Sequence, residues 1–152
     1  MTIAEIMVVL GIISIALFAI NYLVTLSLQA NGLGLLYTKG IFFAQEGLEV
    51  MRILKNQDWQ SNITPLGEGT LYYPVLTGGT WSLETVSPGS LDSIFTRFIT
   101  IEDVFRDADQ NIAPSGTLDP DAKKITVTVR WQHSTGQKEI NIPAYMTNIA
   151  LP

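Results

Sequence analysis

Catalysis by a serine nucleophile needs a histidine beside it as the base, and this chain has one histidine, His133. His133 lies at the end of a predicted strand, next to a turn, where a surface polar role is the ordinary one. The absence of cysteine excludes thiol nucleophiles, disulfides and cysteine-ligated metals. No Gly-x-Ser-x-Gly, Walker or dinucleotide-binding glycine pattern is present. We therefore expect a protein that is not an enzyme.

A group of acidic residues could instead bind a metal ion. Asp107, Asp109 and Asn111 imitate the start of an EF-hand loop, whose oxygens at alternate positions suit Ca²⁺. The pattern then fails, because its sixth position is Ile112 and its twelfth is Leu118, where glycine and glutamate are required. The alternative is a solvated turn rich in Asp and Asn. No cofactor is expected, and calcium at the first three residues stays open as an alternative.

The distribution of charge separates two parts of the chain. Of the 9 basic and 14 acidic residues, only Glu5 precedes Lys39. The whole chain has 152 residues, a net charge of -5 and a pI near 4.7. An acidic chain lacks the clustered Lys and Arg that neutralise phosphates, so nucleic acid is not the expected main partner. The composition predicts an apolar segment joined to a folded domain.

The apolar segment runs from Ile6 to Leu28 and is long enough to cross a membrane. Its interruptions are small or polar and uncharged: Gly11, Ser14, Asn21, Tyr22, Thr25 and Ser27. A run of about 18 or more apolar residues can span a bilayer as a helix. A cleaved secretory signal is disfavoured, because no Lys or Arg precedes the run.

Glu5, which directly precedes the apolar segment, is a charged residue whose role composition alone does not explain. An ionisable group at the edge of an apolar helix is costly and is usually paired and functional. The available cation is the α-amino group of Met1, four residues earlier, either of the same chain or of another subunit. In an ordinary membrane anchor, Glu5 would have no evident role.

The first seventeen residues, Met-Thr-Ile-Ala-Glu-Ile-Met-Val-Val-Leu-Gly-Ile-Ile-Ser-Ile-Ala-Leu, resemble the mature N-terminus of a type IV pilin or pseudopilin. The matching positions are Thr2, Glu5, Val8 and Gly11, within unbroken aliphatic filling. Met1 replaces the phenylalanine that the family usually has there.

The resemblance implies a processing and assembly pathway. Met1 would become the N-terminus after a prepilin peptidase removes a leader, and its amine would be methylated. The helix would reside in the cytoplasmic membrane before assembly and in the core of a helical homopolymer afterwards. The assembly machinery and other copies of the chain would be its partners, and Glu5 would pair with Met1 of a neighbouring subunit.

Helical periodicity continues beyond residue 28 to about Lys55. Apolar residues recur at spacings of three and four, as on one buried face of a helix: Ile41, Ala44, Leu48, Met51 and Leu54. We expect a transmembrane or filament-core helix at 1–28, an amphipathic continuation at 29–55 and a globular head at 56–152.

The stretch 29–34 is the weak point of this helix. Asn31, Gly32 and Gly34 disfavour helix, with glycine costing about 1 kcal/mol relative to alanine. Two readings are open, namely two helices joined by a loop, or one helix that extends locally. Pilins of the resembled family melt on assembly near a proline that would correspond to Tyr22, so here we expect melting at 29–34 instead.

The head is expected to be an antiparallel sheet packed on the outer half of the long helix, giving an α+β fold. The predicted strands are Thr70–Leu76, Thr80–Val86, Phe95–Phe105, Lys124–His133 and Lys138–Met146. Gly78-Gly79 is a hairpin signal between the first two. Apolar residues alternate with polar ones along the fourth, which predicts one buried and one solvated face.

Together these features predict a structural subunit of a type IV pilus-like filament at the cell surface, acting in adhesion, motility or DNA uptake. A pseudopilin of a type II secretion system is an alternative that the residues do not separate from it. A simple membrane-anchored binding module is the alternative from another class.

Overall fold

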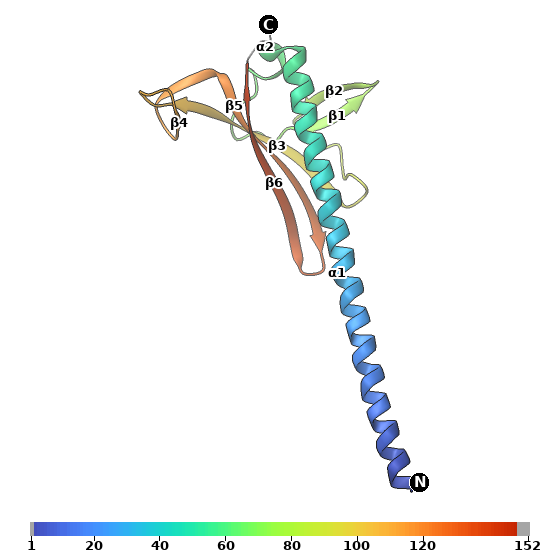
Figure 1. Cartoon of the computed structure of the whole chain (residues 1–152). Helices are drawn as coiled ribbons and strands as arrows, with labels where there is room; N and C mark the ends of the chain where they lie inside the picture. Colours follow the sequence, from blue (N-terminus) through green and yellow to red (C-terminus); the bar gives the residue numbers. More distant parts are fainter. Residues whose placement is uncertain (1, 149–152) are drawn as a thin grey trace. The chain divides into compact units, whose positions relative to one another are not determined.

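The computed structural model describes residues 2–148. The chain divides into two compact units, Met1–Thr38 and Lys39–Pro152. Helix α1, Ile3–Gln57, is one continuous element that contributes to both units (Figure 1). The long N-terminal helix and the antiparallel strands confirm the predicted α+β fold.

Helix α1 ends two residues later than the sequence predicts, and a short helix follows it. Asp58 caps α2, Trp59–Asn62, with its Oδ1 atom accepting hydrogen bonds from the Gln60 and Ser61 amides. The Ser61 hydroxyl donates to Asp58 Oδ2 at 2.6 Å, and this bond is the main cause that lowers the pKa of Asp58. Asn62 Nδ2 donates to the Leu54 carbonyl near the end of α1, at 3.0 Å. Polar side chains therefore satisfy the backbone where the chain turns.

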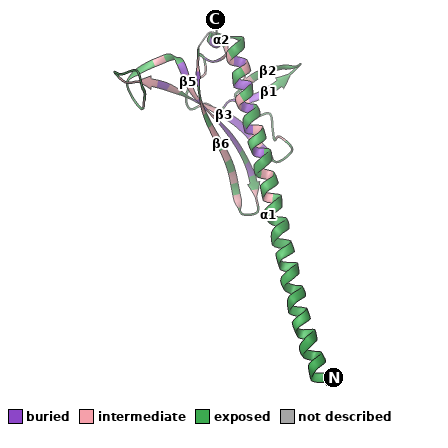
Figure 2. Cartoon of the chain, in the orientation of Figure 1, coloured by how far each residue is buried: buried purple, intermediate pink, exposed green. Residues whose placement is uncertain are grey.

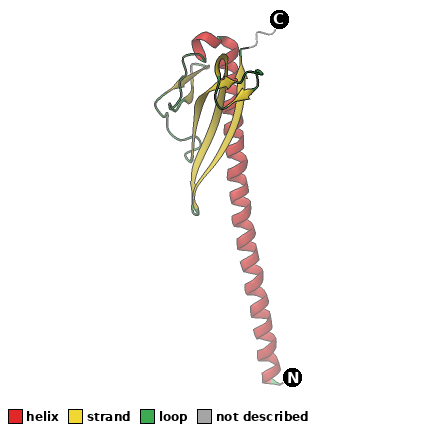
Figure 3. Ribbon diagram, turned by 90° about the vertical axis from the view of Figure 1, so that its left-hand side faces the viewer, coloured by secondary structure: helices red, strands yellow, loops and turns green. Residues whose placement is uncertain are grey.

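Within residues 39–148, six strands form two antiparallel sheets (Figure 3). The smaller sheet pairs β1, Tyr73–Thr77, with β2, Thr80–Glu84. The larger has the order β4-β3-β5-β6, and its strands are Phe95–Arg106 (β3), Ile112–Ala113 (β4), Thr117–His133 (β5) and Gly136–Thr147 (β6). The predicted turn at Gly78-Gly79 is confirmed, with both glycines at positive φ.

The predicted alternation along β5 is confirmed in the core of the head. Ile125, Val127, Val129 and Trp131 are buried, with at most 2% of each residue exposed. On the opposite face, Arg130 is exposed and its charge lies near Glu139 of β6. One exception is Thr128, which is buried where its hydroxyl donates to Asn141 Oδ1 at 2.7 Å.

The helix face packed on this sheet matches the predicted one at Ala44, Met51 and Leu54, which are buried, and differs from it at two positions. Ile41 is 43% exposed and Leu48 only half-buried, although both were expected in the core. The buried residues are Gly40, Ala44, Gly47, Val50, Met51 and Leu54. The face is rotated because glycine and alanine let helix and sheet approach closely. A Cβ atom at Gly40 would lie 2.8 Å from Ile140 Cδ1.

Arg97 of β3 is a buried charge in the same interface. It is 6% exposed, and its Nη1 atom donates to the Phe43 carbonyl at 3.0 Å and to Glu46 Oε2 at 2.5 Å. Both acceptors belong to α1, so one side chain of the sheet forms hydrogen bonds with the helix at two positions. A buried charge of this kind is tolerated because it is paired and hydrogen-bonded.

Candidate functional site

The first unit is a helix whose apolar side chains are open on all sides. An 18-residue window of α1 has a mean hydropathy of 2.7, and none of that window is buried (Figure 2). Phe18 is 76% exposed, and Ile20, about 200° around the helix from it, is 57% exposed. By length and composition α1 can cross a membrane, which is compatible with membrane anchoring.

Glu5 closes a reciprocal cap at the start of α1. The Thr2 amide donates to Glu5 Oε2 at 2.8 Å, and the Glu5 amide donates to the Thr2 hydroxyl at 3.3 Å. This is the capping box of a Thr-x-x-Glu sequence, in which two orphan N–H groups at a helix start are satisfied together. The expectation that Glu5 has no role in a lone anchor was therefore wrong. Met1, its expected partner in assembly, lies outside the described residues.

Three polar side chains farther along the apolar segment donate hydrogen bonds to backbone carbonyl groups of their own helix. The Ser14 hydroxyl donates to the Leu10 carbonyl at 2.7 Å, and Asn21 Nδ2 donates to the Leu17 carbonyl at 2.9 Å. The Thr25 hydroxyl donates to the Asn21 carbonyl, also at 2.9 Å. Bonds of this i to i−4 kind occupy donors that hydrocarbon surroundings would otherwise leave unsatisfied.

The stretch with Asn31, Gly32 and Gly34 is helical without a break. The Thr38 hydroxyl even bonds back to the Gly34 carbonyl at 3.0 Å, as in a regular helix. The reading of two helices joined by a loop is therefore wrong for the single chain. Glycine weakens a helix without abolishing it when the flanking residues favour helix. Melting of this stretch in an assembled filament stays a prediction.

The three candidate calcium ligands form a tight turn between β3 and β4. Asp107 Oδ1 accepts hydrogen bonds from the Asp109 and Asn111 amides, each at 2.9 Å. Gln110, between them, has a positive φ of 65°. These bonds explain the Asp and Asn content as turn chemistry. Within residues 2–148, no group of three or more His, Cys, Asp or Glu side chains is placed to hold a metal ion.

His133 is the last residue of β5 and precedes the turn that joins β5 and β6. Its Nδ1 atom lies 3.1 Å from the Thr135 hydroxyl and 3.3 Å from the Ser134 hydroxyl. Across the described part of the chain, no carboxylate is placed to orient this ring through a hydrogen bond. The contacts are those of a polar turn, as the sequence predicts for this residue.

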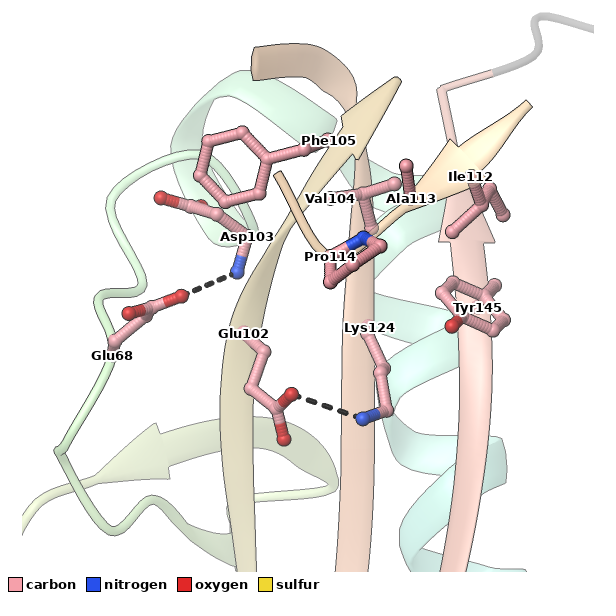
Figure 4. Close-up of a pocket in the computed structure, with 10 residues that line it drawn as sticks. All are labelled: Glu68, Glu102, Asp103, Val104, Phe105, Ile112, Ala113, Pro114, Lys124 and Tyr145. Carbon is pink, nitrogen blue, oxygen red and sulfur yellow. Dashed lines mark hydrogen bonds and ion pairs between the residues drawn. The ribbon is translucent and has the colours of Figure 1, made fainter. Parts of the chain in front are cut away.

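A hollow of about 520 Å³ in the head was not predicted from the sequence (Figure 4). The Lys124 ammonium donates to Glu102 Oε2 at 2.9 Å, and this bond raises the pKa of Lys124. Glu68 Oε1 accepts a hydrogen bond from the Asp103 amide at 2.8 Å. Tyr145 contributes to the wall. Of the charged side chains that Figure 4 draws, only Lys124 and Glu102 pair with each other, and the rest of the wall is largely apolar, with Val104, Phe105 and Ile112 among its residues.

No protein-family model, no curated protein and no solved structure matches the chain.

Proposed function

We propose that the chain is a non-enzymatic structural subunit of a type IV pilus-like filament. The observation that carries the proposal is the change of surroundings along α1. Its first part exposes apolar side chains on every side and carries one charge, Glu5, whereas its last part buries one face in a β-sheet head. A helix that is apolar all round requires apolar surroundings all round.

Both a membrane and a bundle of like helices supply such surroundings. The subunit would be stored in the cytoplasmic membrane and then transferred into the filament core with its head outward. A head-to-tail contact between identical chains that does not close into a ring produces an open helical filament. Transfer from one apolar environment to another removes little apolar surface from water or exposes little to it, so assembly by an external machinery can be reversible.

Glu5 would select the axial position of each new subunit. Its carboxylate in the filament core would be strongly disfavoured without a partner. The α-amino group of a neighbouring subunit's Met1, freed by a prepilin peptidase, is the partner that the resemblance to pilins implies. The resulting surface filament would serve adhesion, motility or DNA uptake, and a pseudopilin of a type II secretion system would use the same features.

One observation favours a second candidate, a simple membrane-anchored binding module. The capping box between Thr2 and Glu5 gives the carboxylate a role that needs no other subunit. In this alternative the helix only anchors the head.

Electron microscopy of material sheared from cells that express the chain distinguishes the two candidates. Antibodies against the head should label filaments in the sheared fraction, and cells lacking the chain are the control. Label confined to the membrane fraction would contradict the filament and support the anchor.

A further inference from the structure

Asn31 and Gly32 form the one Asn-Gly pair in the sequence. The other six asparagines are followed by tyrosine, glutamine or isoleucine. In an Asn-Gly pair the backbone nitrogen of the glycine can attack the side-chain carbonyl carbon of the asparagine, because glycine has no Cβ atom to obstruct the cyclic imide that results. Both residues are exposed, and a Cβ atom at Gly32 would meet nothing within 4 Å. The pair therefore has the chemistry and the space for spontaneous deamidation.

The side-chain amide of Asn31 is not fixed by a hydrogen bond. Within residues 2–148, no hydrogen bond of the Asn31 side chain is found, whereas Nδ2 of Asn21 on the same helix donates to the Leu17 carbonyl at 2.9 Å. The Asn31 amide can therefore turn toward the backbone of the next residue without breaking another contact.

The helical backbone opposes the reaction. Helix α1 is continuous through this stretch, and in a regular helix the Gly32 N–H donates to the Leu28 carbonyl. A nitrogen held in this way is directed along the helix and away from the side chain of the preceding residue. Attack therefore requires that residues 29–34 leave the helical conformation. Local opening of this kind also precedes the exchange of amide hydrogens with water.

Opening is easier at this stretch than in the part of α1 that packs on the sheet. Gly32 and Gly34 lie within one turn, and each favours the open form about fivefold relative to alanine, which corresponds to about 1 kcal/mol. None of the residues 29–34 is buried, and the first buried residue of α1 is Gly40. Little packing is therefore lost when this turn opens.

We propose that Asn31 is a deamidation site and that opening of α1 at 29–34 controls its reaction. The Gly32 nitrogen loses its proton to water and forms a bond to Cγ of Asn31. The bond between Cγ and Nδ2 breaks, and the amide nitrogen takes up a proton and leaves as ammonia. Water then adds to one of the two carbonyl groups of the cyclic imide and opens the ring. The product is aspartate or isoaspartate at position 31, formed without an oxidant.

The product makes the opening irreversible. It introduces a carboxylate into the stretch 6–38, which carries no charge, and an anion is costly there when the surroundings are apolar. Isoaspartate also routes the main chain through the side chain and lengthens it by one carbon atom, so the regular helix cannot re-form across it. This inference goes beyond the proposed function, because it concerns the single chain with or without a filament.

The rate of deamidation in purified full-length protein, kept in detergent at mildly alkaline pH, tests the proposal. Peptide mass spectrometry follows aspartate and isoaspartate at position 31, with Asn21 as the internal reference. A synthetic peptide of residues 27–38, too short to hold a helix, gives the rate of the open chain. The full-length protein should react about 10 to 100 times more slowly than the peptide.

Two glycine variants test the control by local opening. Gly34→Ala keeps the Asn-Gly pair and should slow the reaction in the full-length protein about fivefold. Gly11→Ala is the matched control, because it also replaces a helical glycine with no neighbour within 4 Å, and it should leave the rate unchanged.

Three results would overturn the proposal. Equal rates in the peptide and the full-length protein would show that the helix gives no protection. The absence of product at position 31 after about ten half-lives of the peptide reaction would show that the helix does not open there. Equal rates in Gly34→Ala and the wild type, or equal slowing by Gly11→Ala, would show that opening at 29–34 does not control the reaction.

Discussion

Gly47 of α1 lies directly against Val127 of β5. A Cβ atom at position 47 would come to 2.7 Å from Val127 Cγ1 and to 3.2 Å from Arg97 Cδ. Real Cβ atoms do not approach other carbons as closely as the first of these distances, so the helix reaches the sheet here because residue 47 has no side chain.

Gly47→Ala should destabilise the head. Alanine gains about 1 kcal/mol in helix propensity, but overpacking a well-packed core costs about 1–3 kcal/mol, and β-branched Val127 is stiff at χ1. We expect a net loss of about 1 kcal/mol in the free energy of unfolding, the difference of those two effects. Urea unfolding of the full-length protein in detergent, followed by tryptophan fluorescence, measures it.

Gly40→Ala is the control for this prediction. Its closest neighbour would be Ile140 Cδ1, the far end of a flexible side chain that can move aside. The loss should therefore be smaller than for Gly47→Ala. If Gly47→Ala proves as stable as the wild type, the close approach at this residue does not limit the packing.

Glu46→Ala should also destabilise the head, through Arg97. The arginine side chain is 3% exposed, so removing Glu46 leaves a buried charge with the Phe43 carbonyl as its remaining recorded acceptor. Breaking a fully buried pair costs about 3–5 kcal/mol. Glu46 is 46% exposed, and water can partly replace it, so we expect about 1–3 kcal/mol.

The ion pair between Glu49 and Arg52 is a matched control on the same helix. Its N–O distance of 2.6 Å is close to the 2.5 Å of the buried pair, but both of its side chains are more than half exposed. Glu49→Ala should therefore cost at most about 0.5 kcal/mol. Equal losses for the two variants would show that burial of Arg97 adds nothing to the worth of its pair.

These two predictions concern residues that sequence patterns miss. Periodicity of apolar residues located the helix and most of the strands, because apolar and polar residues alternate over 125–132 and the apolar segment is almost free of charge. It missed the short strand β4, and it placed the start of β5 at Lys124, seven residues after the observed start at Thr117. It placed Ile41 rather than Gly47 in the core, since glycine carries no hydrophobic signal and close packing depends on the partner sheet. Arg97 was missed for a related reason, because a charge is expected at the surface unless its partners are known.

At the candidate site, by contrast, the sequence contains a recognisable signal for the observed contact. The Thr2-x-x-Glu5 spacing of the capping box is readable in the sequence, but the resemblance to pilins drew attention to a partner in another subunit. The continuous helix at 29–34 could not be read from propensity, because two glycines and an asparagine argue against it while their neighbours, packed into one long cooperative helix, outweigh them.

Stiffening that stretch tests whether it must extend on assembly. Gly32→Ala combined with Gly34→Ala should favour the helical form by about 2 kcal/mol. We expect fewer or shorter filaments with normal amounts of subunit in the membrane, measured by microscopy and by immunoblot of the same cells. Gly34→Ala alone should show part of the same effect. A wild-type filament whose helix is unbroken through 29–34 would contradict the idea.

The most direct test of the central claim is the filament yield of Glu5→Gln, measured against membrane-bound subunit in the same cells. Glutamine can still close a capping box with Thr2, but it cannot pair as an anion with a neighbour's α-amino group. Glu5→Ala loses both interactions. If charge pairing drives assembly, the two variants should be equally deficient, by about 100-fold for a lost partner worth about 3 kcal/mol, with membrane levels unchanged. Wild-type filament yield from Glu5→Gln, with Glu5→Ala alone deficient, would show that the carboxylate acts only as a cap and would contradict the account.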